Sequence, residues 1–467
     1  MKILKFAFLS VFMTVSIASY TQSIEKIEPP TWWIGLKTQL QLMVYGKDLK
    51  NASVISKEKN IKIINVYNAD SDNYIFVDIK LGRDLKPGKY ELIVNVKGKT
   101  IPIEYTLNER RLHSNLRDGF STKDMIYLLM PDRFANGDSS NDSVAELEDK
   151  YSPNNPIGRH GGDIQGIINS LDYLQSLGVT TIWPTPVLFD NEPKVSYHGY
   201  ACADYYKIDP RYGNNDLYRE FVAKSKDKNI KIIFDFVPNH CGINHWWIDD
   251  LPFKSWINQF PQFTRSNYAM TTHSDRYASD YDKNMLTRGW FDYSMPDMNL
   301  ENSYVLKYFT QNIIWWIEWA DLSGVRIDTY PYSDKKQISA LTKSIIDEYP
   351  NLKIVAESWY HSPSEVAYWE KDANNIDKFK SNLTNVMDFP LQDAIIAGFP
   401  EDSVPGWGEG MFRIYRLLSQ DFVYKNPFDL LIFADNHDTN RISEIVKSNP
   451  AKLKMILTLI ATMRGIP

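Results

Sequence analysis

The chain has 467 residues, which is enough for two or three domains, and 43% of them are apolar, which is enough for a large core. A formal charge of −6 without a basic stripe argues against nucleic-acid binding. The 13 Trp and 28 Tyr residues either line sugar-binding sites or fill cores.

Residues 1–23 begin with the basic residues Lys2 and Lys5, followed by an apolar stretch at 6–17 that is too short to span a bilayer stably. Small residues come next. The pattern predicts a secretory signal peptide, with a membrane-anchored helix as the alternative, and therefore an exported protein that is periplasmic or secreted. Since no other segment reaches ~18 apolar residues, we expect no integral membrane protein.

Residues 24–115 contain short apolar runs separated by turn signals such as Pro87-Gly88. Regularly spaced strands of this kind predict an N-terminal, immunoglobulin-like β-sandwich. Trp32 and Trp33 near its start are either a sugar-binding platform or, as we favour, packing or dimer contacts, because no second aromatic cluster joins them.

From residue 116 onward, apolar strand-like runs alternate with amphipathic helix-like stretches. The predicted strands are 125–130, 180–184, 230–236, 324–327, 353–356, 385–388 and 430–434. The predicted helices include 164–177, 215–225, 303–320, 334–349 and 451–463. Seven such repeats in residues 116–467 predict an α/β fold, a (β/α)8 TIM barrel.

Two features depart from a regular barrel. The segment at 241–301, after the third predicted strand, is too long for a loop, and long excursions of this kind are usually functional. The chain also ends after only seven predicted strands. We therefore expect a truncated barrel with two unpaired edges.

Four short segments follow the ends of predicted strands, the face on which barrel active sites form. They are DFVPNH at 235–240, GVRIDTY at 324–330, AES at 356–358 and ADNHDT at 434–439. They supply the carboxylates Asp328, Glu357 and Asp438. Two carboxylates that flank a glycosidic bond are the minimum for acid-assisted glycoside cleavage.

Arg326 precedes Asp328 by two residues, so both side chains point to the same side of the strand. An adjacent guanidinium keeps a carboxylate ionised, as a nucleophile requires. Taken singly, each residue is better explained by a structural role: Asp328 as a surface acid or helix cap, Glu357 as an ion-pair partner and His240 as a structural histidine. Four ordered matches together favour the catalytic interpretation.

This ordered set resembles the α-amylase superfamily (glycoside hydrolase family 13). The resemblance implies a retaining mechanism in which Asp328 is the nucleophile, Glu357 the general acid/base and Asp438 the transition-state stabiliser. It also implies a set of substrate-binding residues: Arg326, His240, His437, Tyr200 and His198. Finally, it implies that 241–301 is the small domain B and that Gly465-Ile466-Pro467 begins an eighth strand.

A loop rich in oxygen ligands, from Asn136 to Asp142, is followed by Gly161-Gly162-Asp163. It is either a Ca²⁺ site or a polar turn. With the preceding segment Pro131-Asp132-Arg133-Phe134, it resembles the calcium loop of cyclodextrin-acting relatives. That resemblance implies a structural Ca²⁺ held by Asn136, Asp138, Asn141, Asp142, the Gly161 carbonyl and Asp163.

The segments Thr329–Tyr332, Glu28–Trp33 and Met295–Asn299 resemble neopullulanase- and cyclomaltodextrinase-like enzymes of bacterial starch-utilisation systems. The implied activity is retaining hydrolysis of α-1,4 bonds, with α-1,6 bonds as a further candidate, in maltodextrins, pullulan or cyclodextrins. α-Glucan oligosaccharides are the implied partners, and a homodimer through the N-terminal domain is also expected. The alternatives are a transglycosylase on the same substrates and a catalytically dead glucan-binding relative.

Cys202 and Cys241 are the two cysteines of the chain. Export permits a disulfide between them, but two cysteines are not a disulfide framework, and burial as small apolar residues is equally expected.

Overall fold

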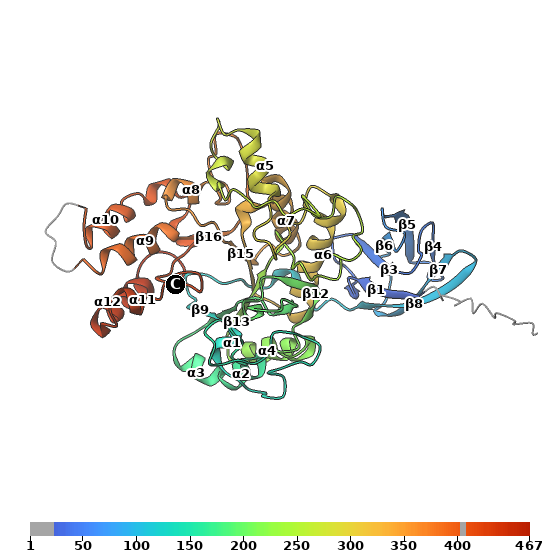
Figure 1. The fold of residues 1–467 in the computed structure, drawn as a ribbon, viewed down its shortest axis with the longest axis horizontal. Helices are drawn as coiled ribbons and strands as arrows, with labels where there is room; N and C mark the ends of the chain where they lie inside the picture. Colours follow the sequence, from blue (N-terminus) through green and yellow to red (C-terminus); the bar gives the residue numbers. More distant parts are fainter. Residues whose placement is uncertain (1–22, 402–407) are drawn as a thin grey trace, which may run out of the picture.

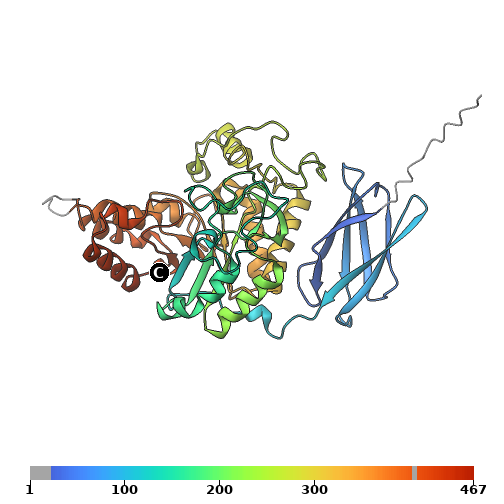
Figure 2. The same ribbon diagram turned by 60° about the horizontal axis from the view of Figure 1, so that its bottom comes forward.

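The computed structural model describes residues 23–401 and 408–467. A β-sheet domain lies at one end of the molecule, a curled parallel sheet with its helices lies in the middle, and the C-terminal helices lie at the other end (Figures 1 and 2). The predicted signal peptide, apart from its last residue, lies outside the described residues. Within the described ranges, no helix has both the length and the apolar character that crossing a bilayer needs.

The N-terminal domain consists of two four-stranded sheets, as the sequence predicts. The first has the order β1 (Ile24–Glu28), β3 (Leu40–Gly46), β6 (Tyr74–Leu81) and β5 (Ile61–Asn68), and the second the order β2 (Thr31–Trp33), β8 (Lys99–Asn108), β7 (Gly88–Val96) and β4 (Ser53–Ser56). β6 is buried on both faces over its first four residues. One reason is that Phe76 stacks on Phe253, which belongs to the segment after the third barrel strand.

The central sheet contains seven strands, all parallel. Their order is β9 (Ile126–Leu129), β10 (Thr181–Pro184), β13 (Lys231–Phe236), β14 (Gly324–Ile327), β15 (Lys353–Ala356), β16 (Asn385–Met387) and β17 (Leu430–Leu431). All seven lie within the predicted segments. The strands are almost entirely buried, as expected when helices cover one face and side chains fill the interior on the other.

The last residues of the chain bond to both edges of this sheet. Ile466 pairs with β17, because its N–H donates to the Leu430 carbonyl at 2.8 Å and its carbonyl accepts from Ile432 at 2.9 Å. At the other edge, the Ile126 N–H of β9 donates to the Pro467 carbonyl at 2.8 Å. The expectation that both edges are unpaired is therefore wrong at this level of the sheet.

Gly465 makes this closure possible. Its φ is +104°, and a Cβ there would lie 2.8 Å from the Leu430 carbonyl oxygen. Only glycine combines that conformation with so close an approach.

The helices follow the predicted alternation with one clear difference. They are α1 (Pro131–Phe134), α2 (Ile164–Asn169), α3 (Leu171–Ser176), α4 (Asn215–Asp227), α5 (Asp280–Arg288), α6 (Ser303–Ala320), α7 (Lys335–Glu348), α8 (Pro363–Ala367), α9 (Phe389–Gly398), α10 (Phe412–Leu418), α11 (Ile442–Ile445) and α12 (Pro450–Thr462). The predicted helix 164–177 is divided at Ser170 into α2 and α3, because the Ser170 hydroxyl donates back to the Gly166 carbonyl.

Helix α6 packs between the barrel and the N-terminal domain. Toward the barrel, Trp316 stacks on Phe234 of β13. Toward the sandwich, Gln41 N donates to Gln311 Oε1 at 2.7 Å, Gln311 Nε2 donates back to the Gln41 carbonyl at 2.8 Å, and Tyr308 bonds to Glu28. Both faces of α6 are therefore covered by side chains from different parts of the chain.

The segment between β13 and α6 folds over the carboxyl ends of the strands and contains α5 (Figure 1). It is anchored through buried Asp297, which accepts hydrogen bonds from Asn239 at 3.1 Å and Asn258 at 2.8 Å. His240 and Asp297 also form an antiparallel bridge. These bonds place the insertion beside the end of β13.

Candidate active site

The four predicted segments meet at the carboxyl ends of the barrel strands, where a cavity of about 330 Å³ opens. Its lining includes seven of the predicted catalytic and substrate-binding residues: Asp328, Glu357, Asp438, His198, Tyr200, His240 and His437. The rest of the wall consists of Thr329 and of apolar and aromatic side chains: Met130, Tyr197, Met270, Phe291, Met295, Tyr332 and Trp359. The mixture of clustered acids and ring faces suits a polyhydroxylated, C–H-rich ligand.

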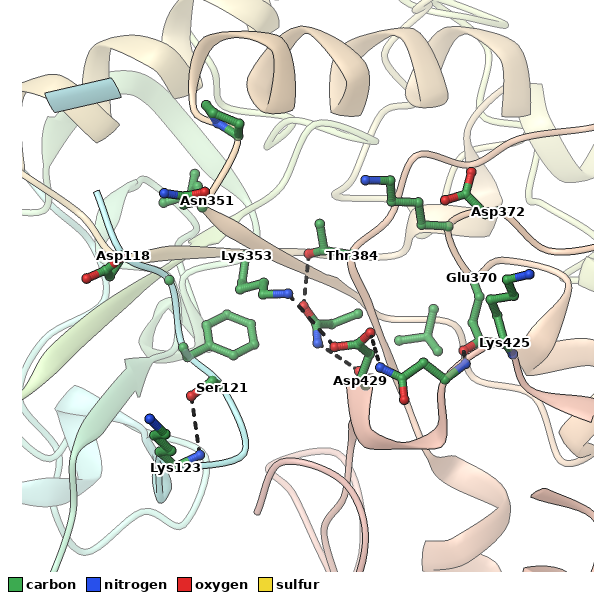
Figure 3. A pocket seen from close by; sticks show the side chains of 18 of the residues that line it. Asp118, Ser121, Lys123, Asn351, Lys353, Glu370, Asp372, Thr384, Lys425 and Asp429 are labelled. Atoms are coloured by element: carbon green, nitrogen blue, oxygen red, sulfur yellow. Dashed lines mark hydrogen bonds and ion pairs between the residues drawn. The ribbon is translucent and has the colours of Figure 1, made fainter. Parts of the chain in front are cut away.

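A larger cavity, of about 650 Å³, lies at the opposite end of the sheet, beside the first residues of β15 and β16 (Figure 3). Two of its four acids are engaged in local structure: Glu370 accepts from the Lys425 N–H at 2.8 Å, and Asp429 accepts from Asn426 Nδ2 at 2.7 Å. None of the predicted catalytic residues lines this cavity. Since barrel chemistry occurs at the carboxyl ends of the strands, we place the site in the smaller cavity.

Arg326 organises the acids of the site from below. It is fully buried, and its Nη1 donates to Asp328 Oδ1 at 2.6 Å and to Asp235 Oδ1 at 2.8 Å. Its Nη2 lies 3.0 Å from Glu357 Oε2. The sequence predicts Arg326 as a substrate-binding residue, but the structure places it under the cavity floor, in contact with three carboxylates.

One cation against several acids leaves the site with excess negative charge. Burial, followed by the charge of Asp235, raises the pKa of Asp328 to about 6 in spite of Arg326. Burial and the charge of Asp328 raise the pKa of Glu357, while burial and the charge of Glu357 raise the pKa of Asp438 to about 6. The raised pKa values bring the ionisation of these carboxyl groups closer to neutral pH, which suits an acid/base pair.

Two histidines of the cavity wall are neutral. Burial lowers the pKa of His240 and that of His437 to about 3. His240 Nε2 and His437 Nδ1 are buried without a protein hydrogen-bond partner, while His437 Nε2 bonds to the Tyr200 hydroxyl at 2.7 Å. His240 Nε2 is thus a polar atom of the cavity wall that a ligand hydroxyl can satisfy.

His198 is fixed by its neighbours. Its Nδ1 accepts from the Tyr200 N–H at 2.8 Å, and its Nε2 lies 3.1 Å from Glu192. With Asp190, these residues form the one group of three metal-type ligands found among the described residues. Because the Tyr200 bond requires Nδ1 to be an acceptor, Nε2 carries the proton and donates to Glu192, so hydrogen bonding accounts for this contact without a metal.

Sequence reasoning missed three residues that support the site. Asp235 receives the indole N–H of Trp183 at 2.9 Å in addition to the Arg326 bond. Thr329 donates its N–H to Glu357 Oε2 at 2.9 Å and its hydroxyl to Asp328 Oδ2 at 3.0 Å. An acid within the apolar strand 231–236 is a readable signal for Asp235. Thr329 is singled out only as part of the segment 329–332, with no role of its own, and nothing in the sequence marks Trp183.

The predicted calcium loop brings together part of its ligand set. Asn136 Nδ2 donates to Asp142 Oδ1 at 2.7 Å, and a Cβ on Gly161 would lie 2.7 Å from the same oxygen. Asn141 Oδ1 is buried without a hydrogen-bond partner. Burial and the charges of Asp163 and Asp138 raise the pKa of Asp142. An orphaned amide oxygen beside an excess of acid fits a hard cation.

The other two predicted ligands have additional partners. Asp163 caps α2, accepting from the Gly166 N–H at 2.6 Å, and it also accepts from the Asp138 N–H at 2.8 Å. Asp138 is exposed and accepts from Ser140. These bonds also fix the shape of the loop, as the polar-turn alternative predicts.

Two further predictions concern buried residues. Cys202 and Cys241 are free and buried, so the disulfide is not formed. Trp32 and Trp33 are 1% and 6% exposed, and the ring of Trp33 packs edge-on against Trp315 of α6. They are packing residues and have no exposed face to offer a sugar.

Comparison with known proteins agrees with this geometry. Residues 128–467 match the model of the α-amylase catalytic domain, and residues 26–111 match that of the cyclomaltodextrinase N-terminal domain. The cyclomaltodextrin glucanotransferase of Klebsiella oxytoca is 29% identical over 74% of this chain and 57% of that protein. The cyclomaltodextrinase of Thermoanaerobacter pseudethanolicus is 29% identical over 73% of this chain and 55% of that protein.

Solved structures give the same result. The α-amylase of Geobacillus thermoleovorans, complexed with acarbose, has a TM-score of 0.62 at 28% identity, over 75% of this chain and 70% of that one. An Anoxybacillus α-amylase has a TM-score of 0.61 at 29% identity, over 74% of this chain and 70% of that one. The chain spans little more than half the length of the two relatives above. With the catalytic-domain model matched over most of its length, the chain belongs to the α-amylase family.

Proposed function

We propose that this chain carries the active site of a retaining glycoside hydrolase that cleaves α-1,4-glucosidic bonds. The observation that carries the proposal is the pairing of Asp328 and Glu357 on one guanidinium, with Asp328 Oδ1 at 2.6 Å from Arg326 Nη1 and Glu357 Oε2 at 3.0 Å from Arg326 Nη2. An inverting enzyme separates its two carboxyl groups by ~6.5–9.5 Å to admit a water, whereas carboxyl groups that share one guanidinium are held close together. They suit the ~5–5.5 Å of a retaining pair.

In the first step, the Asp328 carboxylate attacks the anomeric carbon and Glu357, protonated, gives its proton to the leaving oxygen. Arg326 supports this division of labour, because it bonds to Asp328 at a shorter distance than to Glu357 and so favours the ionised form of Asp328. Asp438 faces the same space and supplies negative charge to the oxocarbenium-like transition state.

In the second step, Glu357 takes a proton from water, and the resulting hydroxide equivalent displaces Asp328 from the anomeric carbon. The raised pKa of Glu357 suits a group that first donates and then accepts a proton. The unpartnered ring nitrogen of His240 provides a hydrogen-bonding group for a sugar hydroxyl on the cavity wall, whereas both ring nitrogens of His198 are engaged with Tyr200 and Glu192.

The proposed substrates are maltodextrins, pullulan and cyclodextrins, with α-1,6 bonds as a further target. Relatives named cyclomaltodextrinase and intracellular maltogenic amylase support α-glucans as the class. The aromatic wall formed by Phe291, Tyr332 and Trp359 supports binding of sugar rings by stacking.

The test is product analysis after incubation with each glucan, next to Asp328→Asn as the matched control. We expect panose from pullulan or linear maltooligosaccharides from cyclodextrin with the wild-type chain, and a loss of at least about 10³-fold in the variant. Products of inverted anomeric configuration, or equal activity in the variant, would contradict the proposal. Longer products formed when glucose is added would instead assign transglycosylation.

We further propose a structural Ca²⁺ in the loop after β9, held by oxygens of Asn136, Asn141, Asp142 and the Gly161 carbonyl, with Asp138 and Asp163 completing the set. The ion would stabilise the loop and take no part in bond cleavage. Calorimetry of the EDTA-treated protein with and without added Ca²⁺ tests this idea, and we expect a higher melting temperature with Ca²⁺. An unchanged melting temperature, matched by an unchanged Asp142→Asn variant, would remove the site.

Export and a homodimer through residues 24–115 are proposals that rest on the sequence pattern. Cell fractionation of the full-length chain tests the first. Light scattering of the purified chain, with and without residues 24–115, tests the second.

A further inference from the structure

Thr329 has an unusual backbone conformation immediately after the proposed nucleophile. Its φ is 41° and its ψ is 41°, which is the left-handed region. A β-branched residue is a genuine outlier there, because its Cβ substituents crowd the backbone. Such conformations persist where surrounding structure enforces them, and they are concentrated at functional sites.

The conformation has a visible consequence for both catalytic carboxylates. The Thr329 N–H donates to Glu357 Oε2 at 2.9 Å, and the Thr329 hydroxyl donates to Asp328 Oδ2 at 3.0 Å. The same residue also begins a tight turn, because its carbonyl accepts from the Tyr332 N–H at 3.0 Å. One residue thus joins the end of β14, the nucleophile and the general acid.

The two oxygens of Asp328 are held differently. Oδ1 accepts a short, charge-assisted bond of 2.6 Å from Arg326. Oδ2 accepts only the neutral hydroxyl of Thr329. Breaking the hydrogen bond to the Thr329 hydroxyl costs less free energy than breaking the bond to Arg326. Oδ2 is therefore the oxygen that is better placed to attack the anomeric carbon.

We propose that Thr329 is a positioning residue that aims Asp328 Oδ2 at the anomeric carbon and sets the ionisation of Asp328. The proposal rests on the proposed glycosidase function and assigns a residue to it that the sequence pattern does not mark. Thr329 acts through the two carboxylates and transfers no proton itself.

Other charged groups around Asp328 define what the hydroxyl can change. Arg326 and Asp235 face Asp328 from β14 and β13, Asp438 from the segment after β17 and Glu357 from the segment after β15. His198, Tyr200 and Tyr332 complete the titratable surroundings. The Thr329 hydroxyl is the neutral donor among them, and it favours the carboxylate form of Asp328.

The test compares Thr329→Ala with Thr329→Ser in the full chain, using initial rates on cyclodextrin between pH 4 and pH 9. The serine variant keeps the hydroxyl and the alanine variant removes it, while both lose the methyl group. We expect the acid limb of the kcat profile to move up by about half to one pH unit in Thr329→Ala and to stay in place in Thr329→Ser. We also expect the plateau kcat of Thr329→Ala to fall about 3- to 10-fold with KM within about twofold.

A Thr329→Val variant keeps the branched shape and lacks the hydroxyl. The acid limb of its kcat profile should therefore move up as it does in Thr329→Ala. An acid limb that stays in place in both Ala and Val, or that moves equally in Ser, would overturn the role of the hydroxyl. Absence of glucan cleavage by the wild-type chain would instead overturn the proposed function. Circular dichroism melting curves of each variant separate these results from a loss of folding.

Discussion

Two arginine–carboxylate clusters in this protein differ in their balance of charge. Between the sandwich and the barrel, half-buried Arg110 lies 2.6 Å from Glu348 and 3.0 Å from Glu318, and buried Arg117 lies 3.3 Å from both Glu318 and Asp321. Arg111 and Lys226 also pair with Asp321, so cations offset the acids in this cluster. Under the active site, the single Arg326 faces Asp235, Asp328 and Glu357. The balanced cluster joins two parts of the chain, while the acid-rich cluster holds raised pKa values that suit proton transfer.

The largest expected effect comes from removing Arg326, the single cation of the acid-rich cluster. Arg326→Met should lower kcat by about 10³-fold, because Asp328 loses its charge-assisted partner and the buried acids then share protons among themselves. Steady-state kinetics on cyclodextrin measure the effect, and a melting curve controls for folding. Activity within tenfold of wild type would mean that the cation is dispensable.

The balanced cluster should affect stability and leave chemistry unchanged. Glu318→Gln removes the one acid that Arg110 and Arg117 share, although Glu348 and Asp321 remain, so we expect the free energy of unfolding to fall by about 2 kcal/mol with kcat within about twofold. Urea unfolding followed by fluorescence and steady-state rates in native buffer provide the two readings. A large loss of kcat with unchanged unfolding would reverse the assignment of the two clusters.

The pH dependence of activity tests whether the excess of acids around Arg326 raises the pKa of Asp328. As the proposed nucleophile, Asp328 must be ionised to attack, and burial raises its pKa to about 6, so the rate should fall as the pH drops below about 6. Asp235→Asn removes a like charge, which lowers the pKa of Asp328 and moves the acid limb down by about half a pH unit. The exposed, distant Asp172→Asn is the control. A shift to higher pH in Asp235→Asn would show that Asp235 acts mainly through Arg326.

The smallest expected effect concerns Glu28, at the contact between the sandwich and α6. Burial raises its pKa to about 7 although Lys26 lies 3.2 Å away. A raised pKa contributes stability that is fully present below the ordinary Glu value and is lost as the pH rises through about 7. The free energy of unfolding of the wild type should therefore fall by about 1–2 kcal/mol between pH 5 and pH 8, whereas that of Glu28→Gln should not show this loss.

Melting temperatures of wild type and Glu28→Gln across that pH range test the effect. We expect the variant to gain relative to wild type as the pH rises. A constant difference between the two proteins would mean that Glu28 is already ionised throughout.

The features that follow from local patterns were predictable. Apolar runs ending in polar residues located Asp328, Glu357 and Asp438, because parallel strands bring their carboxyl ends to one face. The left-handed backbone at Thr329 was not predictable, because a threonine carries no local signal for that conformation. The family resemblance implied that Gly465-Ile466-Pro467 begins an eighth strand, but no local pattern marks the close approach at Gly465 through which Ile466 and Pro467 reach both edge strands.

Helix α6 packs against the N-terminal domain on one face and against the barrel on the other, and this limits which domains can be exchanged. Trp315 packs on Trp33 of the sandwich, and the adjacent Trp316 packs on Phe234 of the barrel, so consecutive residues of one helix serve different hydrophobic interiors. Exchanging the N-terminal domain for an unrelated one would leave a strip of tryptophan in water. We therefore expect that gene fusions and domain exchanges among related proteins keep the N-terminal sandwich and the barrel together.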